Sequence, residues 1–204
     1  KMADIKLPML GEHNVQNCLA ALSICIEMGI SEAAIRKGLE QFKGVGRRFD
    51  FKGMVNGITV IDDYGHHPVE IKASLSAGRM RCPDGKLIAV VQPHRYTRLR
   101  DLFEDFCACF NDADDVLVAD VYAAGEAPID GFEKADLVAG LHAYGHRNAA
   151  VLSSPEALAD EILARASSGD LVMCLGAGTI TNWAGTLPNE LALKTGHPVE
   201  GDGA

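Results

Sequence analysis

A dense group of acidic and imidazole side chains follows the first strand-like run of the chain. The segment reads Asp62, Asp63, Tyr64, Gly65, His66, His67, Pro68. Carboxylates and imidazoles can move protons, accept hydrogen bonds from hydroxyl groups or bind a metal ion. A metal site is the less favoured interpretation, because neighbouring histidines in an extended segment point in opposite directions and no ligand lies one helical turn away. We therefore predict no bound metal here.

Basic side chains follow the second strand-like run, in the segment from Gln92 to Arg98. Arg95 and Arg98 are three residues apart and would share a face in a first helical turn. Guanidinium groups on one face suit two-point binding of a carboxylate or phosphate, so the pair predicts an anionic ligand group. The alternative is a solvated basic turn in which the arginines pair with Glu104 or Asp105.

Two further patterns have both a chemical and a structural interpretation. The glycine turn at 176–180 could present backbone N–H groups to an anion, but it lacks the third glycine of a dinucleotide fingerprint, so tight strand-to-helix packing is favoured. His142 and His146 have metal-binding spacing for a helix. Gly145 lies between them and Arg147 adjoins, so a solvated helix end is favoured.

Short apolar runs alternate with amphipathic stretches from residue 57 onward. The runs that predict strands are 58–61, 87–91, 116–119, 149–152 and 171–175. The stretches that predict helices are 68–80, 100–110, 134–144, 155–165 and 179–191. This alternation predicts an α/β fold with a mostly parallel, doubly wound sheet covered by helices on both faces. Ligands of such sheets bind beyond the carboxyl ends of the strands, where the acidic and basic groups lie.

The first 46 residues predict a separate pair of helices. One apolar periodic run stops at Gly29, and a second starts at the N-cap residue Ser31 and stops at Gly44. The stretch 44–49 mixes glycines with two arginines, which indicates a linker. We expect a helical unit at 1–46, an α/β unit at 47–192 and a loose, Gly-rich tail at 193–204.

Composition excludes several classes of protein. With 48% hydrophobic residues and no apolar stretch near 18 residues, the chain predicts a soluble globular protein without a membrane span. The net charge of −9 opposes nucleic-acid binding. The six cysteines form no CxxC pair, and the first residues lack a signal-peptide pattern, so we expect reduced thiols and a cytoplasmic location.

Five segments occur together in the order and approximate spacing of one enzyme family. They are GEHNVQN from Gly11, GVGRRF from Gly44, DDYGHHP from Asp62, QPHRYTR from Gln92 and GAGTI from Gly176. In this order they resemble the Mur ligases, and the likeness covers nearly the whole chain. QPHRYTR is most similar to the member that adds L-alanine.

The resemblance implies the last part of a three-domain ligase. Mur ligases have an N-terminal UDP-sugar domain, a central ATPase domain and a C-terminal Rossmann-like domain that brings the amino acid. Residues 1–46 resemble the final helices of the central domain, and 47–192 resemble the complete C-terminal domain. The sequence holds no GxxxxGK[ST] phosphate loop, so we expect the chain alone to be inactive. The implied reaction uses ATP and Mg²⁺ to convert the carboxylate of UDP-N-acetylmuramate to an acyl phosphate, which the amine of L-alanine attacks.

The resemblance also implies roles for residues that would meet ATP. Asn14 and Asn17 match the asparagines near adenine, Arg48 matches the interdomain arginine that reaches the phosphates, and Asp63 matches the aspartate on the ribose hydroxyls. For the two asparagines, capping of a helix is the structural alternative. Arg48 is the catalytic residue predicted by this likeness, and it would engage the nucleotide only when the domains close about the 44–49 linker.

A second set of residues matches the amino-acid end of the site. Tyr64, His66, Arg95 and Arg98 correspond to positions that contact the alanine end of the substrate or product, and the arginines would hold its carboxylate. His13, His67 and His94 lie beside matched positions.

Two other functions compete with this one. The first is the murein tripeptide ligase of cell-wall recycling, and the second is a noncatalytic Rossmann-like module that binds an anion or nucleotide. We also expect that the helical segment, without the rest of its domain, exposes a face that favours dimers.

Overall fold

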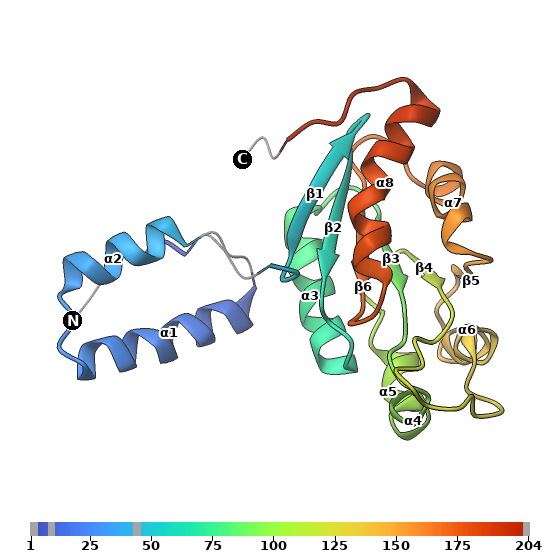
Figure 1. Ribbon diagram of the computed structural model, residues 1–204, viewed down its shortest axis with the longest axis horizontal. Helices are drawn as coiled ribbons and strands as arrows, with labels where there is room; N and C mark the ends of the chain where they lie inside the picture. Colours follow the sequence, from blue (N-terminus) through green and yellow to red (C-terminus); the bar gives the residue numbers. More distant parts are fainter. Residues whose placement is uncertain (1–3, 8–10, 43–45, 202–204) are drawn as a thin grey trace. The chain divides into compact units, whose positions relative to one another are not determined.

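The computed structural model describes residues 4–7, 11–42 and 46–201, without the side chain of His13. The chain divides into two compact units, residues 1–46 and 47–204 (Figure 1).

The first unit contains the two predicted helices, α1 (Glu12–Glu27) and α2 (Glu32–Gln41). Gly29 takes the left-handed conformation just after α1, with φ of 73°. Ser31 caps α2 and accepts a hydrogen bond from the backbone N–H of Ala34 at 3.4 Å. The predicted stop at Gly44 lies outside the described residues.

The second unit is built on a six-stranded sheet in the order β1-β2-β6-β3-β4-β5. The strands are β1 (Asp50–Val55), β2 (Ile58–Asp63), β3 (Leu87–Val91), β4 (Asp115–Val118), β5 (Ala149–Val151) and β6 (Leu171–Leu175). Strands β2 to β6 are parallel, and β1 pairs antiparallel with β2. The five predicted strands are confirmed, whereas β1 is an additional edge strand that the sequence analysis missed.

Helices cover both faces of the sheet, which confirms the predicted fold class (Figure 1). Side chains of α3 (Pro68–Arg81), α5 (Phe103–Ala108) and α6 (Lys134–Ala143) share one buried cluster. Side chains of α7 (Leu158–Arg165) and α8 (Ile180–Thr195) share the other. Every residue of β3 and β6 is buried, which explains why these runs are apolar throughout.

Two helical predictions need correction. The stretch predicted as one helix at 100–110 is two short helices, α4 (Tyr96–Asp101) and α5, which meet at Leu102 with φ of −120°. The stretch 155–165 begins with a 3₁₀ turn, Pro155–Ala157, before α7. Neither break carries a glycine or an internal proline that would reveal it in the sequence.

The tail is more ordered than predicted. Helix α8 continues to Thr195, and Gly196 ends it in the left-handed conformation. Glu200 then pairs with Met54 of β1 through two backbone hydrogen bonds of 2.8 and 3.1 Å. No helix among the described residues is long and apolar enough to cross a bilayer.

Candidate functional site

Three loops meet at the carboxyl ends of the central strands because β6 lies between β2 and β3. The backbone N–H of Gly176, after β6, donates to Asp63 O at the end of β2 at 3.1 Å. The N–H of Gln92, after β3, donates to Leu175 O of β6 at 3.0 Å. Segments that lie more than 80 residues apart in the sequence therefore share one edge of the sheet.

Asp63 anchors the backbone at the centre of this edge. Its Oδ1 accepts hydrogen bonds from Gly65 N at 2.8 Å and Ser74 Oγ at 2.7 Å, and its Oδ2 accepts one from Phe49 N at 2.7 Å. The residue is only 4% exposed. These three hydrogen bonds give Asp63 a structural role in anchoring the backbone. The role on ribose hydroxyls stays a prediction.

A line of rings crosses the site. The Arg48 guanidinium lies 5.7 Å from the centre of the Tyr64 ring, and Tyr64 meets His66 edge to face at 5.1 Å. His66 meets His94 at 5.7 Å, and His94 stacks on Tyr122 at 5.4 Å. The structure thus brings Arg48, Tyr64 and His66 of the predicted site together with His94.

Helix α3 fixes the two histidines that precede it. His66 Nδ1 lies 2.9 Å from Tyr64 O and 3.2 Å from Glu70 Oε2, two acceptors, so this nitrogen carries the proton. His67 is the N-cap residue of α3, and its Nδ1 accepts a hydrogen bond from Val69 N. His66 therefore presents its ring to the site, while His67 has a capping role.

The prediction that Arg95 and Arg98 share a helical turn is wrong, because Arg95 precedes α4 with φ of 72°. Its side chain is half exposed and forms an ion pair of 3.4 Å with Glu126, not with Glu104 or Asp105. Glu126 also accepts hydrogen bonds from the N–H and Oγ1 of Thr97, at 3.0 and 2.7 Å. Hydrogen bonds from the backbone and side chain of Thr97 hold the pKa of Glu126 below its usual value.

Arg98 contacts His94 twice. Its Nη1 lies 3.0 Å from His94 O and 3.1 Å from His94 Nδ1. Because a guanidinium only donates, Nδ1 of His94 is an acceptor and the neutral ring carries its proton on Nε2. These contacts use one of the three nitrogens of Arg98, and the side chain is half buried.

The pKa of His94 lies below its ordinary value. Burial of the ring is the main cause, followed by the positive charge of Arg98 and then by His66 and Arg95. The unfolded chain therefore binds a proton at His94 at a higher pH than the folded chain does. As a result, the free energy of unfolding decreases as the pH falls below about 6.5.

We predict that Arg98→Gln raises the pKa of His94 toward its ordinary value, because the substitution removes the second cause of the shift and leaves burial in place. The measurement is an NMR titration of the His94 ring in this chain, with Arg100→Gln as the control. Arg100 is an exposed arginine paired with Asp101. An equal or lower His94 pKa in Arg98→Gln would contradict this electrostatic account.

The glycine turn after β6 has a packing role. Gln92 Oε1 accepts a hydrogen bond from Ile180 N at 3.1 Å, and Gln92 Nε2 donates to Thr179 Oγ1 at 3.1 Å. A Cβ on Gly178 would lie 2.4 Å from Gln92 Oε1 and 2.7 Å from Tyr122 Cγ. The first N–H of α8 is thus satisfied by protein, which supports the packing interpretation over an anion site.

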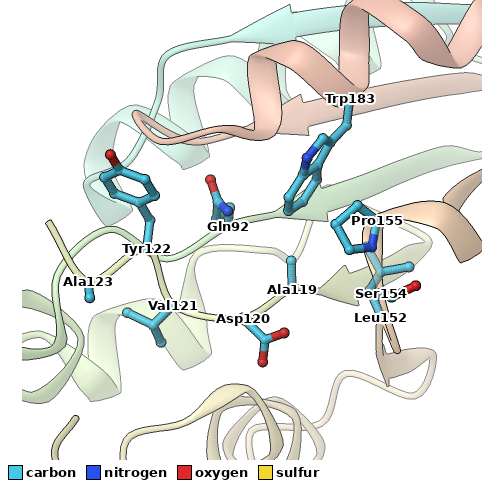
Figure 2. Close-up of a pocket in the computed structure, with 10 residues that line it drawn as sticks. All are labelled: Gln92, Ala119, Asp120, Val121, Tyr122, Ala123, Leu152, Ser154, Pro155 and Trp183. Atoms are coloured by element: carbon cyan, nitrogen blue, oxygen red, sulfur yellow. The ribbon is translucent and has the colours of Figure 1, made fainter. Parts of the chain in front are cut away.

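A pocket of about 270 Å³ lies beside the line of rings, on the side of α8 (Figure 2). Its walls come from the ends of β3, β4 and β5 and from Trp183 of α8. Figure 2 shows the Trp183 ring above Ala119 and facing Pro155, with the Asp120 carboxylate below. Tyr122 and Gln92 belong to both the pocket and the loop edge.

The remaining predicted residues belong to other elements. Asn14 and Asn17 are in α1, whose N-cap residue is Gly11, so neither asparagine caps that helix. His142 Nδ1 contacts His146 O at 2.9 Å, and α6 ends at Ala143 before His146. In the part of the chain that the structure describes, no group of three or more potential ligand side chains is arranged to hold a metal ion.

Sequence reasoning missed residues that the structure places in the site. Tyr122 follows β4, so the rule that ligands bind beyond strand ends would have included it. Arg47 and Arg48 are adjacent arginines in the same segment, and only the fold distinguishes their contacts. Glu126 carried no signal, because its partners come from a different loop.

Comparisons with known proteins identify the family of this chain. Residues 47–178 match the family described as Mur ligase, glutamate ligase domain. The chain is 62% identical over 188 residues to the UDP-N-acetylmuramate–L-alanine ligase of Phenylobacterium zucineum, covering 92% of this chain and 39% of that protein. It is 60% identical to the ligase of the same name from Methylorubrum populi, covering 96% of this chain and 42% of that protein. The chain thus spans about two fifths of the length of these curated relatives.

A solved structure shows the same arrangement. The UDP-N-acetylmuramate-alanine ligase of Thermotoga maritima is 26% identical, with a TM-score of 0.79 over 95% of this chain and 41% of that chain. The murein peptide ligase of Psychrobacter arcticus is 25% identical, with a TM-score of 0.66 over 92% of this chain and 38% of that chain. With its matched domain, its relatives and its parallel sheet in agreement, the chain belongs to the Mur ligase family.

Proposed function

We propose that this chain supplies the amino-acid-binding, nucleotide-closing part of an ATP-dependent ligase that joins L-alanine to UDP-N-acetylmuramate in peptidoglycan synthesis. The observation that carries the proposal is the line from Arg48 through Tyr64 and His66 to His94 and Arg98, at the edge where three loops meet. The relatives with 58–62% identity carry the name of this ligase. Of the two solved structures, the L-alanine ligase has the higher TM-score, 0.79 against 0.66 for the murein peptide ligase.

Arg98 holds the carboxylate of the amino acid. His94 fixes one nitrogen of its guanidinium, so the group is already oriented and loses little freedom when a carboxylate binds. Arg95 adds positive charge from the start of α4, although Glu126 offsets part of it. Tyr64 and His66 belong to the same line of rings as His94 and offer a ring face and an imidazole to the ligand.

Arg48 meets the phosphates. Its side chain is exposed, and a guanidinium fits phosphate oxygens at two points. ATP with Mg²⁺ supplies the phosphoryl group that activates the carboxylate of UDP-N-acetylmuramate. Arg48 offsets the repulsion between the phosphates of ATP and the carboxylate of UDP-N-acetylmuramate. Asn14 and Asn17 of the helical unit bind the adenine.

The two units have separate roles in this proposal. Residues 1–46 end the central ATPase domain, and 47–192 form the ligase domain that closes over the nucleotide. Several apolar side chains of α1 are more than half exposed, as expected for helices that pack on a larger domain or on a second copy. They are Leu19, Ile24 and Ile26, and Met28, just after the helix, is also exposed. The six cysteines are free thiols, in keeping with the cytoplasmic location that we propose.

Arg98→Gln tests the amino-acid site. The assay uses a ligase in which this chain replaces the matching segment of the Phenylobacterium zucineum relative, called the chimaeric ligase below. We expect KM for L-alanine to rise about ten- to hundredfold with kcat little changed, because the lost charged hydrogen bonds act in ground state and transition state alike. Arg100→Gln, an exposed arginine on the same helix, controls for charge. An unchanged KM in Arg98→Gln would remove Arg98 from the site.

A further inference from the structure

The arginine before Arg48 is held by its backbone. Arg47 O accepts a hydrogen bond from Tyr64 N at 2.7 Å, and Arg47 N donates to Asp50 Oδ2 at 3.3 Å. Its φ is 60°, a left-handed conformation that costs free energy in a residue with a side chain. Such a conformation persists only where surrounding contacts fix it.

The side chain of Arg47 supplies those contacts. Its Nη2 donates to Gly176 O at 2.8 Å, which connects it to the turn after β6. Its Nε lies 3.7 Å from Asp62 Oδ2, and its guanidinium lies 4.7 Å from the centre of the Tyr64 ring. Arg47 therefore contacts β2, the turn after β6 and a residue of the proposed amino-acid site.

The contact between Arg47 and Asp62 is electrostatic. Its side chain is fully buried, and burial, more than any other cause, raises its pKa. Thr181 donates to Oδ2 at 2.5 Å, and the two nearby cations are Arg47 at 3.7 Å and Lys52 at 3.8 Å. A buried carboxylate needs such partners, so the charges of Asp62 and Arg47 attract one another, while the hydrogen bond of Arg47 to Gly176 O orients its side chain.

The residue after Arg48 is held in the same way. Phe49 has φ of 49°, and its N–H donates to Asp63 Oδ2 at 2.7 Å. Asp62 and Asp63 are neighbours on β2 and point to opposite sides of the strand. One aspartate thus contacts the residue before Arg48 and the other contacts the residue after it.

We propose that Arg47 is a positioning residue, which fixes the backbone at Arg48 so that the exposed Arg48 guanidinium is aimed at the nucleotide when the units close. The inference rests on the function proposed above for Arg48. Of the 44–49 linker expected from the sequence, Gly44 and Val45 lie outside the described residues, while Arg47 and Phe49 are held by contacts within the second unit.

The first test uses this chain alone and needs no activity. We expect Arg47→Gln to speed hydrogen exchange of the Tyr64 amide at least about tenfold, because that amide donates to Arg47 O. Arg79→Gln is the matched control, since Arg79 also donates to backbone carbonyls, those of Cys82 and Gly85, near the start of β3. Unchanged Tyr64 exchange in Arg47→Gln would overturn the proposal.

The second test is a double-mutant cycle in the chimaeric ligase. We expect Arg47→Gln to lower kcat about ten- to hundredfold with KM for ATP little changed, because the geometry of Arg48 matters most in the transition state. In an Arg48→Ala background, Arg47→Gln should have almost no further effect on kcat. Arg47→Lys, which keeps the charge, should recover part of the rate.

The outcomes separate the two proposals. Equal losses of kcat from Arg47→Gln with and without Arg48 would show that Arg47 acts only on stability, which overturns the positioning role. A chimaeric ligase without activity would count against the proposed function, and the Tyr64 exchange result would then decide whether Arg47 positions this backbone.

Discussion

Replacing Arg48 with alanine is expected to lower kcat of the chimaeric ligase about 10²–10³-fold while the fold stays intact. Removing one preorganised donor from a developing negative charge costs rates of this order. The Arg48 side chain is exposed, so its loss removes little packing. Steady-state phosphate release with ATP and L-alanine as varied substrates measures the effect.

The control for Arg48→Ala is Arg100→Ala. Both arginines are exposed and belong to the same unit, and Arg100 pairs only with neighbouring Asp101 in the contacts described. Long-range attraction of anionic substrates changes equally in both variants, so a difference between them isolates the local role of Arg48. Equal kcat in Arg48→Ala and Arg100→Ala would contradict its assignment to the nucleotide.

The second large effect concerns the glycine turn and needs only this chain. Gly176 has φ of 152°, and a Cβ there would lie 2.8 Å from the backbone oxygen of Gln92. Gly176→Ala should therefore lower the free energy of unfolding by about 3 kcal/mol or more, from backbone strain and overpacking together. Denaturant unfolding followed by the single tryptophan, Trp183, measures this.

Gly185→Ala provides the matched control. Gly185 lies within α8, and its Cβ would meet nothing within 4 Å. Alanine is the better helix former, so this substitution should raise the free energy of unfolding by up to about 1 kcal/mol. If Gly176→Ala were as stable as Gly185→Ala, the close packing of the turn against Gln92 would be refuted.

Four of the five strands that the sequence predicts lie inside the sheet, and the fifth, β5, lies at one edge. The buried strands β3 and β6 are apolar on both faces, and this requirement is visible in their composition. Strand β1 was missed because it is an edge strand with Lys52 and Gly53, and its pairing with β2 shifts register between Phe51 and Gly53. Besides β2, β1 pairs through Met54 with Glu200, which is distant in the sequence.

The candidate site was predictable by location and less so by role. The rule that ligands bind beyond strand ends led to Tyr64, His66 and Arg98, because the strands themselves could be recognised. It could not assign Asp63 to backbone anchoring, since the donors Phe49 and Ser74 come from two other elements. Nor can residue type distinguish two adjacent arginines, one anchored and one exposed.

The most direct test of the central claim is phosphate release by the chimaeric ligase with ATP, Mg²⁺ and UDP-N-acetylmuramate, with and without L-alanine. We expect release that depends on L-alanine, because the chain would bring the amino acid to the activated carboxylate. Release with a murein tripeptide but not with L-alanine would instead assign the chain to the recycling ligase. No release with either acceptor would contradict the proposed function and favour a noncatalytic anion-binding module.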